Sequence, residues 1–180
     1  MNSKVENAIG FLAKKYNENT SKSLSQTFLY KLLAFFDYTS LKETGIPSLR
    51  LKYNAWDRGP VPVEIYEEFK RNKKYSSFEI ENIKEKDYEG KFISPKEEPD
   101  LDHFNQYEIN LMRKLVHQYG KEFINAGEIS ERSHESILSW KKAYQREKNS
   151  KMLYEEEFQS LEAIPEEAET FLIYKELAGL

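Results

Sequence analysis

Apolar residues recur every three or four positions in two long stretches at the start of the chain. The first stretch, Asn2 to about Asn17, predicts an amphipathic helix. The second begins after an N-cap predicted at Ser23 and runs to about Glu43, where Gly45 stops it. Its apolar side chains are Leu24, Phe28, Leu29, Leu32, Leu33, Phe35, Phe36 and Leu41. Because they cover much of the circumference, we expect this helix to be buried on several sides.

Apolar and polar residues alternate after this helix. Residues 49–56 have the two-residue period of a half-buried strand. The chain is predicted to turn at Gly59-Pro60. Pro62 then fits the first turn of a short amphipathic helix, where the missing N–H leaves no bond unmade. We therefore expect one continuous strand–turn–helix unit.

The middle of the chain has no helical periodicity. Short strands are predicted at 78–80 and 91–93, around a polar turn at 87–90. Pro95 and Pro99 mark a linker. This stretch predicts a small hairpin.

The helix start after the linker is the best-encoded boundary in the sequence. Asn105 can cap the helix, and Glu108 can return the bond, as in a capping box. Gly120 ends the same apolar stripe. Further helices are predicted at 121–134, 137–148 and 165–177.

Together these elements predict an α+β, mostly α-helical fold: a compact helical domain with a small β-sheet or hairpin. The 180 residues are enough for one domain with a real hydrophobic core. We place that domain at residues 1–150. Residues 151–180 are expected to form an acidic C-terminal segment that contains the last short helix.

Composition narrows the class of protein. Charged residues make up 32% of the chain and hydrophobic residues 39%, which is typical of a globular protein. No apolar run reaches the length of a membrane span, and no secretory leader opens the chain. The sequence contains no cysteine, which fits a reducing compartment. We therefore expect a cytoplasmic protein that does not enter a membrane.

The net charge of −4 is distributed unevenly along the chain. Residues 1–75 carry 13 Lys or Arg against 8 Asp or Glu, whereas the remainder carries 14 against 23. The asymmetry indicates either two solvated faces of one domain or a basic face that meets an acidic partner. A pI near 5.6 argues against nucleic acid as the main ligand.

Candidate chemistry is sparse. His103, His117 and His134 match no metal-ligand spacing, and no cysteine is present to complete a zinc set. Ser133-His134-Glu135 contains the residue types of a hydrolase triad, but triads are assembled from distant parts of a fold. We interpret these three residues as a polar turn between helices. No glycine-rich phosphate loop occurs, so we expect no enzyme activity, no metal and no cofactor.

The aromatic and charged residues around the predicted turn form the candidate partner-binding site. Asp57 and Arg58 are poor core residues and suit contact with a partner, although an internal salt bridge would also explain them. Trp56 and Tyr53 extend the same surface, unless Trp56 packs in the core. Gly59-Pro60 is interpreted as a structural motif, in which glycine supplies an unusual backbone angle and proline stiffens the chain.

Several short motifs occur in the order found in one known family. They are YKLLAFFD at 30–37, Y-x-A-W-x-x-G-P-V-P-x-x-I-Y at 53–66, L-V-x-x-Y-G at 115–120, I-S-x-x-S-H at 129–134 and W-x-x-A-Y at 140–144. In this order the chain resembles the SocA-like antitoxin family, also called the Panacea domain, which includes phage-associated GepA-like proteins. The resemblance covers roughly residues 28–144.

The resemblance implies a non-enzymatic antitoxin. Family members are commonly encoded beside a toxin or in a prophage, and they neutralise a cognate toxin protein by direct binding. Two alternatives remain open: an adaptor that delivers a partner protein to a protease, and a nucleic-acid-binding regulator that uses the basic N-terminal half. Assembly as a homo-oligomer is also left open.

Overall fold

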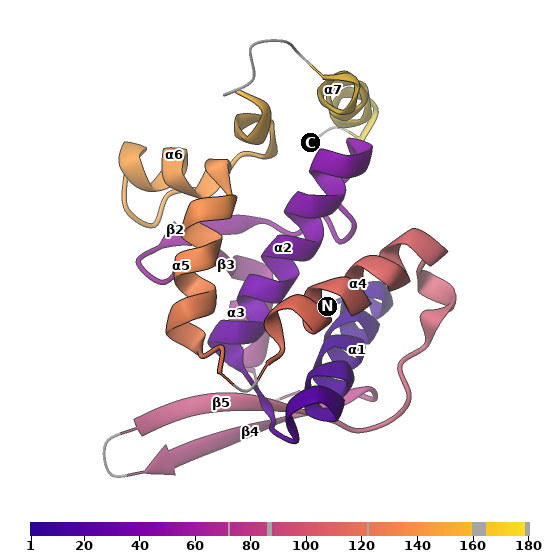
Figure 1. Cartoon of the computed structure of the whole chain (residues 1–180), viewed down its shortest axis with the longest axis vertical. Coiled ribbons are helices and arrows are strands. Elements are labelled where there is room, and N and C mark those ends of the chain that lie inside the picture. The colour runs from indigo at the N-terminus through magenta and orange to yellow at the C-terminus, as the bar shows by residue number, and fades with distance from the viewer. Residues whose placement is uncertain (72, 86–87, 122, 160–164, 179–180) are drawn as a thin grey trace.

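A long buried helix forms the centre of the fold in the computed structural model, which describes residues 1–71, 73–85, 88–121, 123–159 and 165–178 (Figure 1). Helix α2 spans Gln26–Thr44 and ends at Gly45, whose φ is +74°. Every side chain from Phe28 to Tyr38 is buried. The wide apolar surface read from the sequence is thus enclosed on several sides, as predicted.

Helices surround α2 on two sides (Figure 1). On one side lie α1, Ser3–Thr20, and α4, Gln106–Tyr119. On the other lie α5, Ala126–Ser136, and α6, Leu138–Arg146. The helices predicted in these regions are present, with ends that differ by a few residues. Helix α1 continues three residues past its predicted end, and α5 begins five residues later than predicted.

The capping box at the start of α4 is confirmed. The Asn105 side chain accepts a bond from the Glu108 backbone N–H at 2.9 Å, and the Glu108 carboxylate accepts one from the Asn105 N–H at 3.1 Å. Gly120 ends the helix, also as predicted. A boundary encoded within four residues can be predicted because no distant contact is needed to form it.

A three-stranded antiparallel sheet lies at one end of the molecule (Figure 1). Strands β4, Phe78–Glu85, and β5, Tyr88–Pro95, form a hairpin longer than the two short strands predicted. Of the predicted turn at 87–90, Asp87 lies outside the described residues. The third strand, β1, consists of Leu24–Ser25 and pairs with β5.

Strand β1 corrects the predicted start of α2. Leu24 pairs with Ile93, so the backbone stays extended through Ser25. Ser25, rather than Ser23, is therefore the N-cap, and its side chain accepts from the Phe28 N–H. A ladder formed with a strand about 70 residues away overrides the local signal.

A second, two-stranded sheet carries the candidate site. Strand β2, Tyr53–Trp56, pairs with β3, Gly59–Pro62, and Trp56 lies opposite Gly59. Two corrections follow: the turn lies at Asp57-Arg58, and Gly59 begins the returning strand. We call Tyr53–Pro62 the β2–β3 hairpin. Pro62 is its last residue and the N-cap of helix α3, Val63–Phe69, so it precedes the first helical turn.

The predicted strand at 49–56 is wrong in its first half. The backbone N–H groups of Leu49, Arg50 and Leu51 donate to the buried Asp37 carboxylate instead of to a neighbouring strand. Arg50 takes a φ of +59° in doing so. The alternation of apolar residues there reflects burial on one side and not pairing in a sheet.

The described part of the C-terminal segment packs on the end of α2 (Figure 1). It contains a 3-10 helix, η2, Tyr154–Phe158, and helix α7, Glu166–Ala178. A shorter 3-10 helix, η1, Leu101–His103, precedes α4. The mostly helical α+β class is confirmed. Among the described residues, no helix has both the length and the apolar character to span a membrane.

Candidate functional site

A buried lysine holds the β2–β3 hairpin against α2. Lys31 is 1% exposed, and its Nζ donates to the Pro60 carbonyl oxygen at 2.9 Å. Lys31 forms no ion pair with any carboxylate in the described part of the chain. Burial, together with the smaller effect of the nearby positive charge of Arg58, lowers the pKa of Lys31 to about 7. Sequence analysis missed this residue, although a lysine in the middle of an apolar helix was a visible signal.

Gly59 allows the hairpin to approach α2 and α5 closely. Its φ is +94°, and a Cβ there would lie 2.5 Å from Ser133 Oγ and 2.8 Å from Lys31 Cε. Neither the angle nor the space admits another residue without a shift. The structural role predicted for Gly59 thus has a geometric basis in this close approach.

Aromatic stacking fixes the hairpin from the side of α6. The Trp140 indole Nε1 donates to the Trp56 carbonyl at 3.1 Å. His134 stacks on Trp140 with ring centroids 3.8 Å apart and planes 12° apart, and Tyr144 stacks at 4.8 Å. The motifs at 30–37, 53–66, 129–134 and 140–144 therefore meet at one place in the fold.

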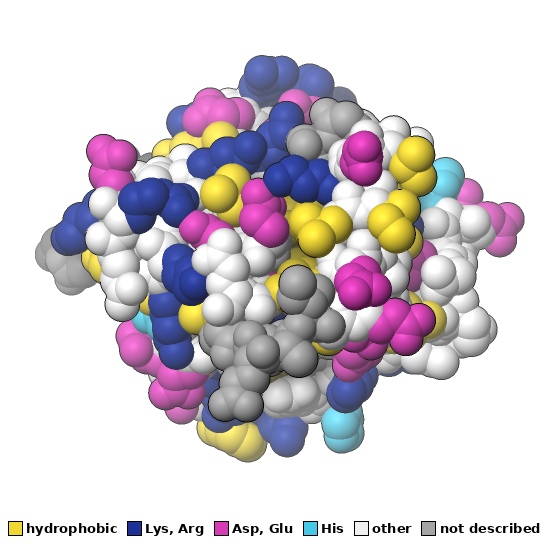
Figure 2. Space-filling view, turned by 90° about the horizontal axis from the view of Figure 1, so that it is seen from above, with side chains coloured by type: hydrophobic (Ala, Val, Ile, Leu, Met, Phe, Trp, Pro, Cys, Tyr) yellow, Lys and Arg dark blue, Asp and Glu magenta, His cyan; other side chains and the backbone are white. Residues whose placement is uncertain are grey.

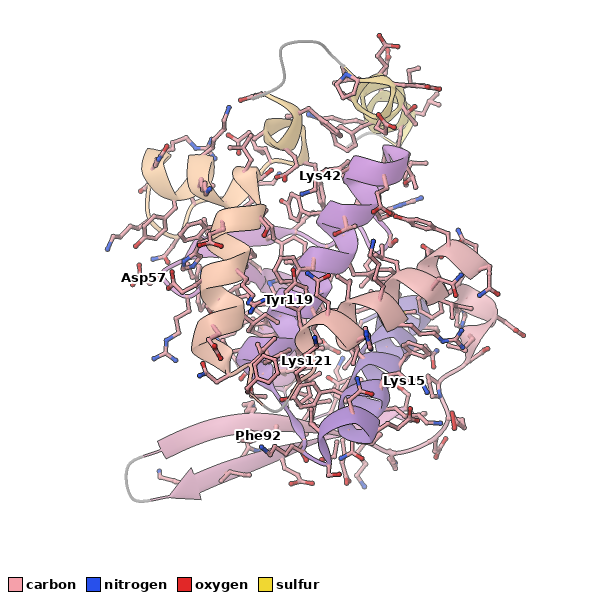
Figure 3. All side chains as sticks on the ribbon, in the orientation of Figure 1. Lys15, Lys42, Asp57, Phe92, Tyr119 and Lys121 are labelled. Atoms are coloured by element: carbon pink, nitrogen blue, oxygen red, sulfur yellow. The ribbon has the colours of Figure 1, made fainter. Side chains whose placement is uncertain are left out.

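The turn residues Asp57 and Arg58 differ in their surroundings. Asp57 Oδ1 accepts a hydrogen bond from the Tyr144 hydroxyl at 2.7 Å and lies 3.7 Å from Lys148 Nζ. The Tyr144 bond and the Lys148 charge lower the pKa of Asp57. Figure 3 shows Asp57 at the outer edge of the molecule beside α5. Arg58 is also exposed and makes no hydrogen bond or ion pair with any described residue.

The two aromatic candidates lie deeper than the charged ones. Trp56 is half-buried and meets Tyr66 edge-on, with ring centroids 4.8 Å apart. Its indole Nε1 is buried and has no hydrogen-bond partner. Tyr53 is 1% exposed, and its hydroxyl donates to Asp37 Oδ2 at 3.0 Å. Placing Tyr53 on a partner-binding surface is therefore a misassignment, because its side chain presents no surface to a partner.

The Asp37 carboxylate organises the loop behind the hairpin. Besides the three backbone N–H groups and Tyr53, the Tyr154 hydroxyl lies within hydrogen-bond distance of Asp37 Oδ2, at 3.2 Å, and of the Leu51 carbonyl, at 2.7 Å. Burial raises the pKa of Asp37, whereas these donors act in the opposite direction. The cluster joins α2, β2 and η2 and serves the fold.

Ser133 and His134 do not form the polar turn that sequence analysis expected. Both lie within α5, and Ser133 is fully buried. The Ser133 hydroxyl donates to the Ser130 carbonyl at 2.6 Å, while His134 Nε2 has no hydrogen-bond partner. These residues support Gly59 and Trp140 by packing. Within the described residues, no group of three His, Cys, Asp or Glu side chains could hold a metal ion.

A surface cavity of about 370 Å³ opens between the hairpin and the start of α2. Lys31 lies in its wall, and Arg58 and Asn149 are exposed at its edge. Its aromatic walls are Tyr30, Trp56 and Tyr66. The lining also includes Gln26, Thr27, Asp57 and Val61. We call this cavity the hairpin pocket. Its walls combine an apolar interior with two cations.

A known protein family has a sequence model that matches the part of the chain containing this site. A family model described as antitoxin SocA-like, Panacea domain, matches residues 29–141, which include Lys31, the β2–β3 hairpin and Trp140. Among curated proteins and among solved structures, no significant match was found.

Proposed function

The chain belongs to the SocA-like antitoxin family with a Panacea domain, and from that premise we propose that it neutralises a cognate toxin protein by direct binding. We further propose that it acts without catalysis, in the cytoplasm, and in the setting of a toxin gene or prophage. The toxin contacts the turn of the β2–β3 hairpin, with Arg58 as the leading contact residue.

The observation that carries this proposal is the rigid support of an exposed, unpaired arginine. Three contacts fix the backbone on both sides of the turn. Lys31 donates to the Pro60 carbonyl, Gly59 lies close to Ser133 and Lys31, and the Trp140 indole donates to the Trp56 carbonyl. Arg58 projects from this frame without an internal partner among the described residues. Arginine is over-represented among residues that dominate binding energy, and a preorganised site loses less entropy when a partner binds.

The geometry around Ser133 and His134 supports a binding role over hydrolysis. The Ser133 hydroxyl is directed to the Ser130 carbonyl and is in close contact with Gly59, so it has no room for a substrate carbonyl. A nucleophile needs a base within hydrogen-bond reach and an open approach. Neither condition is met by these two side chains.

The test begins with the neighbouring reading frame. That frame is expressed alone, and then together with this chain carrying an affinity tag. We expect growth arrest in the first case, and growth plus a stable co-purifying complex in the second. A neighbour that is harmless and forms no complex contradicts the proposal.

Two controls separate the alternatives. If neutralisation depends on proteolytic delivery, the toxin level falls on co-expression only when the host protease is present. If the chain regulates through nucleic acid, it binds DNA or RNA with an affinity that drops steeply with salt. Growth rescue with an unchanged toxin level and no nucleic-acid binding supports direct neutralisation.

A further inference from the structure

The hairpin pocket contains a positive charge that the described residues do not balance. Lys31 is 1% exposed, and its ammonium has three N–H donors but only the Pro60 carbonyl as acceptor. The positive charge of Arg58 adds a repulsive interaction. Buried charges are ordinarily paired, because removing an ion from water is unfavourable.

The fold does not require this charge for packing. The bond that holds the hairpin uses one N–H donor of Lys31, and the positive charge itself makes no ion pair with a described residue, so its burial is unfavourable. Lys31 has two N–H donors without an acceptor, and it lies in the wall of a pocket. This arrangement fits a binding site in which a ligand supplies the missing acceptors.

Two other polar groups of the pocket are donors without a partner among the described residues. The Trp56 indole N–H is buried without an acceptor, and the Arg58 guanidinium has none among the described residues. The one carboxylate of the lining, Asp57, already accepts from Tyr144 and lies near Lys148. Lys31, Trp56 and Arg58 thus have unpaired N–H donors, and a group with negative charge would supply the missing acceptor.

We propose that the hairpin pocket binds an aspartate or glutamate side chain of the protein partner, with the carboxylate received by Lys31 and Arg58. This inference rests on the proposed function, since it names the chemistry by which the partner is recognised. The aromatic walls formed by Tyr30, Trp56 and Tyr66 suit the aliphatic stem of such a residue.

A carboxylate fits the pocket better than a phosphate. With Lys31 protonated, Lys31, Arg58 and Asp57 together carry one net positive charge, which matches a monoanion. Phosphate sites are commonly built from runs of backbone N–H groups in glycine-rich loops, whereas this pocket is lined by residues of α2, the hairpin and α3 and by Asn149. The cavity volume, about 370 Å³, also accommodates a side chain with its flanking backbone.

The first experiment tests the pocket without any partner. The chain has two tryptophans, so ¹⁵N labelling gives two indole N–H signals. The full-length protein is titrated with acetyl-glutamate amide, acetyl-glutamine amide or inorganic phosphate at matched ionic strength. We expect acetyl-glutamate amide to shift the Trp56 signal saturably and the Trp140 signal little. Equal effects of the glutamate and glutamine probes, or tighter binding of phosphate, overturn the proposal.

Variants assign the effect to the pocket. Lys31→Met and Arg58→Gln should each weaken the response to acetyl-glutamate amide by about tenfold or more. Arg113→Gln, at an exposed arginine of α4 that is not part of the pocket lining, is the matched control and should leave it unchanged. If Lys31→Met fails to fold, Arg58→Gln still tests the site, because its side chain is exposed. An unaltered response in Arg58→Gln contradicts the proposal.

The second experiment uses the toxin identified through the neighbouring frame. Arg58→Gln and Lys31→Met should each weaken its binding. Substitution of one acidic residue of the toxin by its amide should weaken binding as well, and combining that toxin variant with Arg58→Gln should cause no further loss of affinity. A toxin that binds both variants normally refutes the pocket assignment and the contact proposed for Arg58, and it leaves the antitoxin role intact. A probe that binds when no toxin is found refutes the antitoxin role and leaves the carboxylate site intact.

Discussion

The hydroxyl of Tyr144 donates a hydrogen bond to Asp57 Oδ1 across 2.7 Å. This bond distinguishes Asp57 from Arg58, the other charged residue of the hairpin turn. Asp57 is tied to α6, and Lys148 lies 3.7 Å away. Its neighbour Arg58 has no such bond to a described residue. The internal interaction that the sequence left open for the pair thus applies to Asp57 alone.

The two residues should respond differently to substitution. Arg58→Glu reverses an unpaired charge at the proposed interface and is expected to weaken toxin binding by about tenfold or more. Asp57→Asn keeps an acceptor for Tyr144 and should change affinity by less than about threefold. Both side chains are exposed, so the melting temperature should stay nearly constant. Calorimetric titration with the toxin and thermal unfolding measure the two effects. A folding defect in Arg58→Glu would assign Arg58 to the structure instead.

Gly59→Ala should destabilise the fold. Alanine is strained at a φ of +94°, and its Cβ would lie 2.5 Å from Ser133 Oγ and 2.8 Å from Lys31 Cε. The two effects together should lower the free energy of unfolding by about 2–4 kcal/mol. Urea denaturation measures the change.

The matched control for that substitution is the double variant Gly59→Ala with Ser133→Ala. Removing the Ser133 hydroxyl relieves one close contact and leaves the backbone strain and the Lys31 contact. We expect it to restore part of the lost stability. If Gly59→Ala alone is as stable as the wild-type chain, the close approach described for the hairpin is wrong.

Much of this fold could be predicted because its signals are local. The α4 capping box needs only Asn105 and Glu108, and the width of the α2 apolar surface implies burial wherever the helix packs. The errors arose where contacts with residues far away in the sequence determine the backbone conformation. The pairing of Leu24 with Ile93 moved the start of α2, and Asp37 drew the backbone of residues 49–51 away from a strand.

The candidate site was predicted in part for the same reason. The motif order located the hairpin, and the unusual glycine angle followed from Gly59-Pro60. The contacts of Lys31 with Pro60 and of Trp140 with Trp56 join residues 29 and 84 positions apart. No spacing in the sequence encodes those distances, and so the pocket could not be derived from it.

Lys31 should make stability depend on pH above neutrality. Its pKa is lowered to about 7 in the folded chain, against 10.5 for an ordinary lysine. Between these values the unfolded chain binds more protons, so the free energy of unfolding rises as pH increases and levels off above 10.5. Below pH 7 both states are protonated, and the full unfavourable effect of burying the charge is present.

Comparison with Lys31→Met isolates this effect from other titrating groups. The wild-type chain should gain roughly 3 kcal/mol relative to the variant between pH 7 and pH 10. Arg58 keeps its charge across this range, and His134, whose pKa is lowered by burial, is neutral throughout. Denaturation at several pH values provides the measurement. Parallel curves for the two proteins would show that Lys31 titrates as an ordinary lysine.

Asp37→Asn should disrupt the loop behind the hairpin. Five donors lie around the carboxylate: three backbone N–H groups and the hydroxyls of Tyr53 and Tyr154. The amide nitrogen of asparagine would face some of these donors without an acceptor. We expect a loss of about 2–4 kcal/mol in unfolding free energy. Tyr154→Phe removes one hydroxyl and should lose about 1 kcal/mol. Equal losses for the two variants would mean that the carboxylate is not the centre of the cluster.

Phe171→Ala tests whether the C-terminal helix is part of the folded domain. Phe171 is 2% exposed and lies 6.1 Å from Tyr154 and 6.3 Å from Phe158, measured between ring centroids. Removing a buried ring of this size should destabilise by about 3–5 kcal/mol in one cooperative transition, because Phe171 belongs to the main hydrophobic core and packs on η2.

The matched control lies on the exposed face of the same helix. Leu172 is 52% exposed, and hydrophobic side chains are visible on the surface at this end of the molecule (Figure 2). Leu172→Ala should change stability by less than about 0.5 kcal/mol. If Phe171→Ala also has no effect on the main unfolding transition, α7 does not share the cooperative core, and the domain ends before it. A loss confined to Phe171→Ala shows that residues beyond 150 complete the domain that carries the hairpin pocket.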